Sequence, residues 1–177
     1  MMDNEKYLES VKQQFQYYKS LGEKAIGQLE PEQLFTQPNV DSNSIAIIVQ
    51  HIAGNMLSRW TNFLTSDGEK EWRKRDAEFE AVLKNKEEVL QKWEEGWTCF
   101  MNSIDNLNPA QLSHTVLIRN EPHTVIEAIN RQLAHYPYHV GQIVFFAKQL
   151  KGNSFRSLSI QKNKSVEFNN EKFSKTK

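Results

Sequence analysis

TVIEAINRQLAHYPYHVGQIVFFAKQLK, residues 124–151, has the apolar periodicity of a long helix. The pattern predicts a helix that begins near Pro122 to Thr124 and runs to about Lys151. A Gly-Asn pair follows directly, which is a typical stop signal at the end of a helix. A helix of this length with an apolar face needs other apolar helix faces to pack against, so further helices are expected elsewhere in the chain.

Three further segments have helical periodicity and complete an expected set of four long helices. Asp41, Ser42 and Ser44 are all good capping residues, so the start of the second helix stays open by a couple of residues. Four such helices with apolar faces are typical of an up-down four-helix bundle. The expected bounds of the first three helices are Asn4–Leu29, Asp41 or Ser42 to Thr65, and Lys86–Leu107.

The residues before the last helix follow a different pattern. TVLIR, residues 115–119, alternates and is rich in β-branched side chains, which favours a short strand. NEPH, residues 120–123, would be the turn, with Thr124 and Val125 as a partial return. We therefore expect an all-α fold with a short β-hairpin before the last helix. Residues 1–160 would form the bundle domain, and residues 161–177 a polar, partly disordered tail.

Composition and charge argue against several classes of protein. Basic and acidic residues number 22 each, so the net charge is zero, which argues against a nucleic-acid binder and against polybasic attachment to membranes. No apolar run reaches the ~20 residues that span a bilayer. The charged N-terminus does not resemble a signal peptide. A single cysteine allows no intrachain disulfide, and a cytoplasmic protein fits best.

Three histidines lie on predicted apolar helix faces. His135 and His139 are one helical turn apart, and His51 lies in the upstream helix SIAIIVQHIAGNMLSRW, residues 44–60. Because positions i and i+4 share a helix face, with Cβ atoms about 5–6 Å apart, two imidazoles can converge on one metal ion and a third can join them from another helix. Pro137 lies between the pair and is expected to kink the helix. The alternative is that all three are core histidines with hydrogen-bond partners.

Polar residues near these histidines are candidates for orienting the ligands or a substrate. For each of them the plainer alternative is an ordinary capping, surface or solvated-connector role. His114 and His123 fall in the predicted strand and turn region and are not expected to be ligands. The candidates are Asn55, Arg131 and Gln142, each one turn from a proposed ligand, and Arg73 in the polar connector SDGEKEWRKRDAEFE, where it could grip an anionic thiol.

The segment HVGQI, residues 139–143, resembles the H-x-G-Q-[LI] signature on the last helix of the DinB-like (YfiT-like) superfamily. His135 matches that family's ligand four residues earlier, and His51 matches its H-[IL]-x-x-x motif on the second helix. The resemblance covers about residues 4–151. This chain departs from the commonest pattern in having Tyr138, where a second histidine is usual, and in having a proline between the two ligands.

Two other stretches, residues 68–80 and 115–132, resemble a Bacillus-type branch of that superfamily whose function is uncharacterised. The resemblance implies a four-helix bundle with a three-histidine site for a divalent metal, which is zinc, nickel or iron. It also implies a homodimer. Some relatives transfer or use low-molecular-weight thiols such as bacillithiol, mycothiol or glutathione.

On this resemblance we expect a metal-dependent transferase or hydrolase-like enzyme. In its most specific form it is a thiol S-transferase that acts on small electrophiles, with His51, His135 and His139 as metal ligands and a small molecule as substrate. One alternative is a non-catalytic bundle that binds a metal or a small molecule. A third reading is a helical interaction module whose histidines are core residues.

Overall fold

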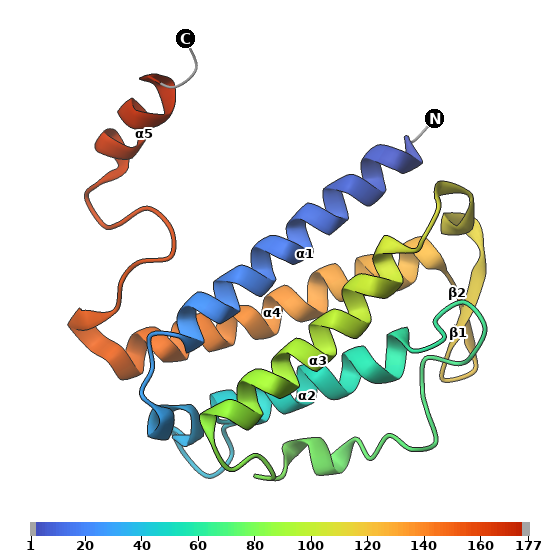
Figure 1. The fold of residues 1–177 in the computed structure, drawn as a ribbon, viewed down its shortest axis with the longest axis horizontal. Helices are drawn as coiled ribbons and strands as arrows, with labels where there is room; N and C mark the ends of the chain where they lie inside the picture. The colour runs from blue at the N-terminus through green and yellow to red at the C-terminus, as the bar shows by residue number, and fades with distance from the viewer. Residues whose placement is uncertain (1–2, 175–177) are drawn as a thin grey trace.

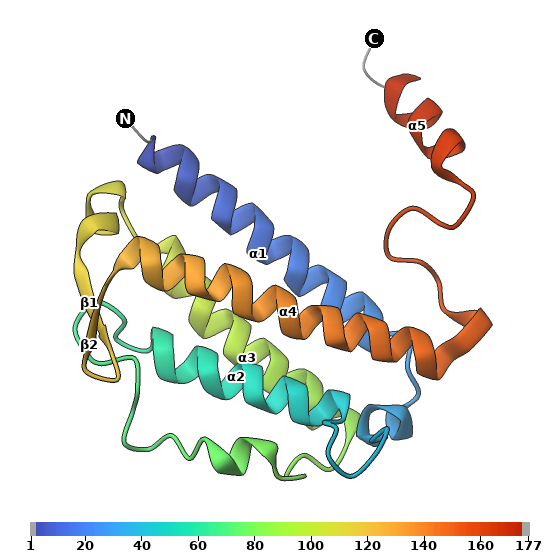
Figure 2. The ribbon, with the colours of Figure 1, turned by 180° about the vertical axis from the view of Figure 1, so that it is seen from behind.

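Four long helices dominate the computed structural model, which describes residues 3–174 (Figure 1). The strongest packing joins the second helix to the third and the first to the fourth, while further contacts join the second to the fourth and the first to the third. Figure 2 shows the same arrangement from behind. The helices are α1 (Asn4–Ile26), α2 (Ile45–Trp60), α3 (Lys86–Asp105) and α4 (Val125–Lys151).

The core lies between these helices and is rich in aromatic side chains. Trp60, Trp97, Phe100 and Tyr136 are buried, and their rings contact one another edge-on or tilted. Such aromatic pairs each contribute about 0.5–1.5 kcal/mol beyond the area they bury. The aromatic core therefore fixes α4 against α2 and α3. The three histidines lie between α4 and α2.

Capping side chains set the starts of the helices. Ser44 accepts a hydrogen bond from the backbone N–H of Ile47, so it is the cap of α2 among the three candidates. Thr124 and Glu127 form a capping box at the start of α4. These starts agree with the sequence pattern to within a few residues. The side chain of Asn85 caps α3 in the same way as Ser44 caps α2.

The ends of the helices differ more from the expected ones. The first helix ends at Ile26, not Leu29, and Gly27, a poor helix former, is its C-cap. The second ends at Trp60, not Thr65, because Thr61 is extended and Asn62 then has a positive φ of 52°. Short 3-10 helices follow each of these two helices. They are η1 (Pro31–Phe35), after α1, and η2 (Asp76–Phe79), after α2. Two more, η3 (Pro109–Ser113) and η4 (Gly152–Ser154), follow α3 and α4.

The predicted hairpin is present, but its turn was placed wrongly. Strand β1 (Thr115–Ile118) pairs antiparallel with β2 (Glu121–Thr124), and the turn consists of Arg119 and Asn120 alone. Both turn residues have positive φ, 56° and 61°, as a two-residue hairpin turn of type I′ requires. Glu121, Pro122 and His123 therefore lie in a strand and not in the turn.

The expectation of a mostly helical chain with a small hairpin is confirmed. The polar tail contains a short helix, α5 (Ser165–Ser174), which the sequence pattern did not predict and of which every residue is exposed. The domain boundary at residue 160 stays a prediction. Among the described residues, no helix has the length and apolar character needed to cross a membrane.

Candidate metal centre

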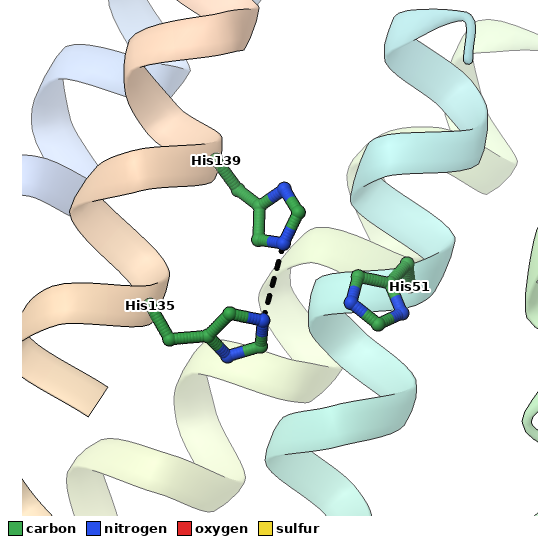
Figure 3. A group of neighbouring side chains, drawn as sticks. All are labelled: His51, His135 and His139. Carbon is green, nitrogen blue, oxygen red and sulfur yellow. Dashed lines mark hydrogen bonds between the residues drawn. The ribbon is translucent and has the colours of Figure 1, made fainter. Parts of the chain in front are cut away.

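Three histidine side chains converge in the space between α2 and α4. His51 points from α2 toward His135 and His139 on α4, as Figure 3 shows. Each can offer one ring nitrogen to a metal, and the three offered atoms lie within 4.8 Å of one another. Helix α4 runs unbroken through Pro137, so the two histidines keep the i, i+4 relation that puts them on one face.

The other nitrogen of each ring is held by an oxygen atom. The Nδ1 atom of His51 lies 2.9 Å from Oε2 of Glu78, that of His139 lies 2.8 Å from Oε1 of Gln142, and that of His135 lies 3.3 Å from Oε1 of Gln132. Carboxylate and amide oxygens only accept hydrogen bonds. Each Nδ1 therefore carries the proton, and each Nε2 is left with a free lone pair.

Two of these lone pairs face each other. The Nε2 atoms of His135 and His139 are 3.1 Å apart. Two unprotonated nitrogens at that distance repel unless a cation lies between or beside them. A proton is disfavoured, since burial and the nearby His139 and His51 lower the pKa of His135 from 6.5 to about 3. Burial also lowers the pKa of His139, against the opposing effect of its hydrogen bond to Gln142. The arrangement suits a metal cation, which binds neutral imidazole.

Glu78 is the most strongly constrained of the three oxygen partners. It is buried, and Arg73 donates to both of its oxygens, from Nε at 2.7 Å and from Nη2 at 3.0 Å. Burial alone would raise the pKa of Glu78, but the hydrogen bonds from His51 and Arg73 outweigh burial and hold that pKa below its usual range. A charged carboxylate behind the imidazole fixes the ring orientation and makes Nε2 a stronger ligand.

Two residues of α2 allow Glu78 to reach His51. Gly54 leaves the room, because a Cβ atom there would lie 2.3 Å from Oε1 of Glu78. Gln50 holds the segment in place, because its side-chain Nε2 donates to the carbonyl oxygens of Ala77, Glu78 and Glu80. These hydrogen bonds hold the connector that contains η2 against α2. Figures 1 and 2 both show it running alongside this helix.

A second buried network lies beside the histidines. Trp60 donates from Nε1 to the hydroxyl of Tyr136 at 3.0 Å, and that hydroxyl donates to Oδ1 of Asn55 at 3.1 Å. All three residues are buried, and burial raises the pKa of Tyr136 far above its usual range. The network joins α2 to α4 one residue from His135. Tyr136 is thus a packing residue of the core, whereas Tyr138 is exposed.

A cavity of about 250 Å³ opens beside two of the histidines. Its lining includes His51 and His135, together with Asn55, Gln132 and several arginines. Within residues 3–174, its walls contain no carboxylate, lysine or cysteine. A small molecule in this cavity would therefore meet imidazole, amide and guanidinium groups.

The predicted site residues have different surroundings. His51, His135 and His139 lie together, and Gln142 contacts His139 as expected of an orienting residue. Arg73 bonds Glu78 and also lines the cavity. Asn55 and Arg131 line the cavity without a hydrogen bond to a histidine in the part of the chain that is described. His114 and His123 lie outside the cluster. Metal binding itself stays a prediction.

Sequence reasoning missed two residues that touch the ligands. Gln132 lies three positions before His135, and this i, i+3 relation mirrors that of His139 and Gln142, so helical spacing could have identified it. Glu78 lies 27 positions from His51, in a connector without periodicity. No pattern in the sequence links those two residues.

Comparison with known proteins places the chain in a family. A family model described as a protein of unknown function (DUF1572) matches residues 3–164, and this family lies in the DinB/YfiT-like fold group. No curated protein and no solved structure gave a significant match. Since the family model covers most of the chain, the protein belongs to the DUF1572 family.

Proposed function

We propose that this protein is an enzyme that depends on a divalent metal held by His51, His135 and His139. The observation that carries the proposal is the convergence of three Nε2 atoms whose partner Nδ1 atoms are all occupied by oxygen acceptors. Three imidazole ligands with a further position open for a reactant are typical of catalytic zinc sites. Imidazole suits zinc, nickel, iron and copper alike, and the resemblance to the DinB-like superfamily favours zinc, nickel or iron in this proposal.

The reaction that fits this site best is the transfer of a low-molecular-weight thiol, such as bacillithiol, to a small electrophile. A divalent metal would supply Lewis acidity and lower the pKa of a thiol or water ligand toward neutrality. In the described part of the chain the cavity offers no cysteine or carboxylate as a nucleophile or base. The nucleophile is therefore expected to come from solution.

The chain's own residues would hold the reactants and the ligands in place. Glu78 keeps the Nδ1 proton on His51 and is itself kept ionised by Arg73. Gln132 and Gln142 do the same for the tautomers of the other two histidines. The amide of Asn55, anchored by Tyr136, is positioned on the wall of the cavity, where it can orient a polar substrate.

One observation favours a second candidate function. The same lack of an acidic or nucleophilic side chain on the walls of the cavity, within the described residues, fits a bundle that binds a metal or a small molecule without catalysis. The two functions share the metal site and differ in turnover alone.

Several broader expectations belong with this proposal. We interpret the packing of α1 to α4 as the up-down four-helix bundle of the DinB-like superfamily, in its Bacillus-type branch. The homodimer, the small-molecule substrate and the cytoplasmic location that accompany this interpretation stay predictions.

Metal analysis tests the proposal directly. Untagged wild type, incubated with zinc, nickel or iron salts and desalted, should retain about one ion per chain. The variant His135→Ala should lose the ion, whereas the control His114→Ala, which alters an exposed histidine outside the cluster, should keep it. Wild type without metal would overturn the proposal. Metal binding without consumption of a thiol, across a set of thiols and aryl or alkyl halide electrophiles, would favour the non-catalytic function.

A further inference from the structure

The cavity beside the histidines is lined by an unusual number of arginines. They come from four separate parts of the fold, namely α2, the connector, the hairpin turn and α4. The fold therefore gathers positive charge at one place although the chain as a whole is neutral. The five residues are Arg59, Arg73, Arg75, Arg119 and Arg131.

Acidic side chains neutralise this charge only in part. The carboxylate of Glu69 lies near three guanidinium groups. Its distance is 3.1 Å to Arg119, 3.6 Å to Arg73 and 3.9 Å to Arg59. Arg73 also has Glu78 as a close partner. Arg131 has no carboxylate within ion-pair distance among residues 3–174. The remaining arginine, Arg75, lies 4.0 Å from the exposed carboxylate of Asp76. Within the described residues, five guanidinium groups thus face three carboxylates, those of Glu69, Glu78 and Asp76, which leaves an excess of two positive charges.

Arg59 is the most informative of the five. It is 5% exposed, and its Nε and Nη1 atoms are buried without a hydrogen-bond partner. Buried donors in folded proteins almost always have a partner, so an exception needs an explanation. The chain even makes room for this side chain, because a Cβ atom at Gly68 would lie 3.1 Å from Cδ and Nη1 of Arg59. Burial lowers the pKa of Arg59, and the neighbouring arginines lower it further against the effect of Glu69.

We propose that this cavity binds the anionic group of a small-molecule reactant, and that the group is a dianion of the phosphate or phosphonate type. Guanidinium groups bind such oxyanions through paired N–H donors. The excess of two positive charges over the nearby carboxylates matches a doubly charged group. A cavity of about 250 Å³ fits a small molecule and not a macromolecule.

The position of the cavity connects this anion to the proposed chemistry. His51 and His135 line the same cavity as the arginines, so a molecule anchored there by its charged group has its other end beside the histidines. That the bound molecule is a reactant rests on the proposed function. The presence of the anion site does not, since the arginines form it without a metal.

Calorimetric titration with inorganic phosphate tests the anion site. Metal-free protein at low ionic strength should bind phosphate, and added salt should weaken the binding. The variant Arg131→Gln should weaken it about tenfold or more, as expected for the loss of a hydrogen bond to a charged group. Arg131 is exposed, so this variant should fold even if the buried Arg59→Met variant does not. The control Arg156→Gln removes the same charge beyond the end of α4 and should bind like wild type.

The outcomes separate the two proposals. Absence of phosphate binding to wild type, or equal affinities of the Arg131→Gln and Arg156→Gln variants, would overturn the anion site. Metal content measured on the same samples would then still decide the proposed function. Phosphate binding to a protein that retains no metal would instead overturn the proposed function alone.

A turnover assay identifies which reactant carries the anionic group. Phosphate should inhibit the zinc-loaded enzyme, and it should compete either with the electrophile or with the thiol. Competition with the electrophile assigns the group to the electrophile, and competition with the thiol assigns it to the thiol. Phosphate that binds but competes with neither reactant would overturn the inference that the anion belongs to a reactant.

Discussion

Glu78 allows the metal site to be tested without altering a ligand. Its carboxylate is 2.9 Å from Nδ1 of His51 and accepts two further hydrogen bonds from Arg73. In a Glu78→Gln variant one of the two oxygens becomes an NH₂ group. Whichever way the amide lies, that group meets a donor, either the Nδ1–H of His51 or the guanidinium of Arg73. The substitution keeps the size of the side chain but removes its charge and at least one hydrogen bond.

The expected cost follows from the loss of an oriented carboxylate behind a metal ligand. Such losses weaken metal binding about 10- to 100-fold, which corresponds to about 1.4–2.7 kcal/mol. Zinc affinity is measured by competition with a chromogenic chelator. The matched control is Glu80→Gln, which removes the same charge from an exposed residue of the same connector. Equal zinc affinities of the two variants, within about twofold of wild type, would refute the argument that Glu78 orients His51.

Gly54→Ala perturbs the same contact by another route. The added Cβ atom would lie 2.3 Å from Oε1 of Glu78, so the carboxylate must move although its charge is unchanged. Zinc affinity should fall toward that of Glu78→Gln, and the double variant should be no weaker than the weaker single variant. Gly141→Ala is the control, because a Cβ atom there meets open space and α4 should gain about 1 kcal/mol of helix stability. Additive losses in the double variant would mean that the two residues act independently.

Two further predictions concern the metal-free protein. The pKa of His135 is about 3 in the folded chain and near 6.5 in the unfolded chain, so between these values the unfolded chain binds more protons. The free energy of unfolding should rise with pH across this window, by at most about 1.4 kcal/mol per pH unit for each such histidine. Urea unfolding between pH 5 and 6.5, above the range in which carboxylates titrate, should show this slope. The variant His135→Gln should reduce the slope. A free energy of unfolding of wild type that does not change with pH would contradict the lowered pKa. Tyr136→Phe should cost about 1–3 kcal/mol in urea unfolding by leaving Nε1 of Trp60 buried without an acceptor, and stability equal to that of the exposed-site control Tyr138→Phe would disprove a role for the hydroxyl.

Local patterns predicted much of the fold and the three histidines. Helical periodicity depends on neighbouring residues, so four long helices could be placed from the sequence. The pair His135 and His139 shares a helix face by spacing alone. Helix ends were predicted less well, because one residue in an unusual conformation decides them. The second helix ends early because Thr61 is extended and Asn62 has a positive φ, and periodicity indicates neither conformation.

The support of the histidines could not be predicted, because it depends on contacts between distant parts of the chain. A solvated role was the plainer alternative for the polar connector, yet the side chains of Arg73 and Glu78 within it are buried. Their burial requires Gln50 to fasten the connector along α2 and Gly54 to leave room for a carboxylate. Gln50 and Gly54 are one turn apart on α2, but no sequence pattern links them to Arg73 or Glu78. These residues come into contact when η2 packs on α2.

The net charge of the whole chain does not reveal the positive charge that lines the cavity. A net charge of zero correctly excludes a strong long-range field, but it says nothing about how folding distributes arginines and carboxylates. Folding places Arg59 and Arg131 beside His135 and leaves both without a close carboxylate. Burial of Arg59 without hydrogen-bond partners for two of its nitrogens destabilises the folded chain, and the fold itself gives no reason for it. An anion in the cavity would offset the excess positive charge of the arginines that line it, and it would stabilise the folded chain in proportion to the logarithm of its concentration. The excess of arginines over carboxylates at the cavity is therefore best explained by what the cavity binds.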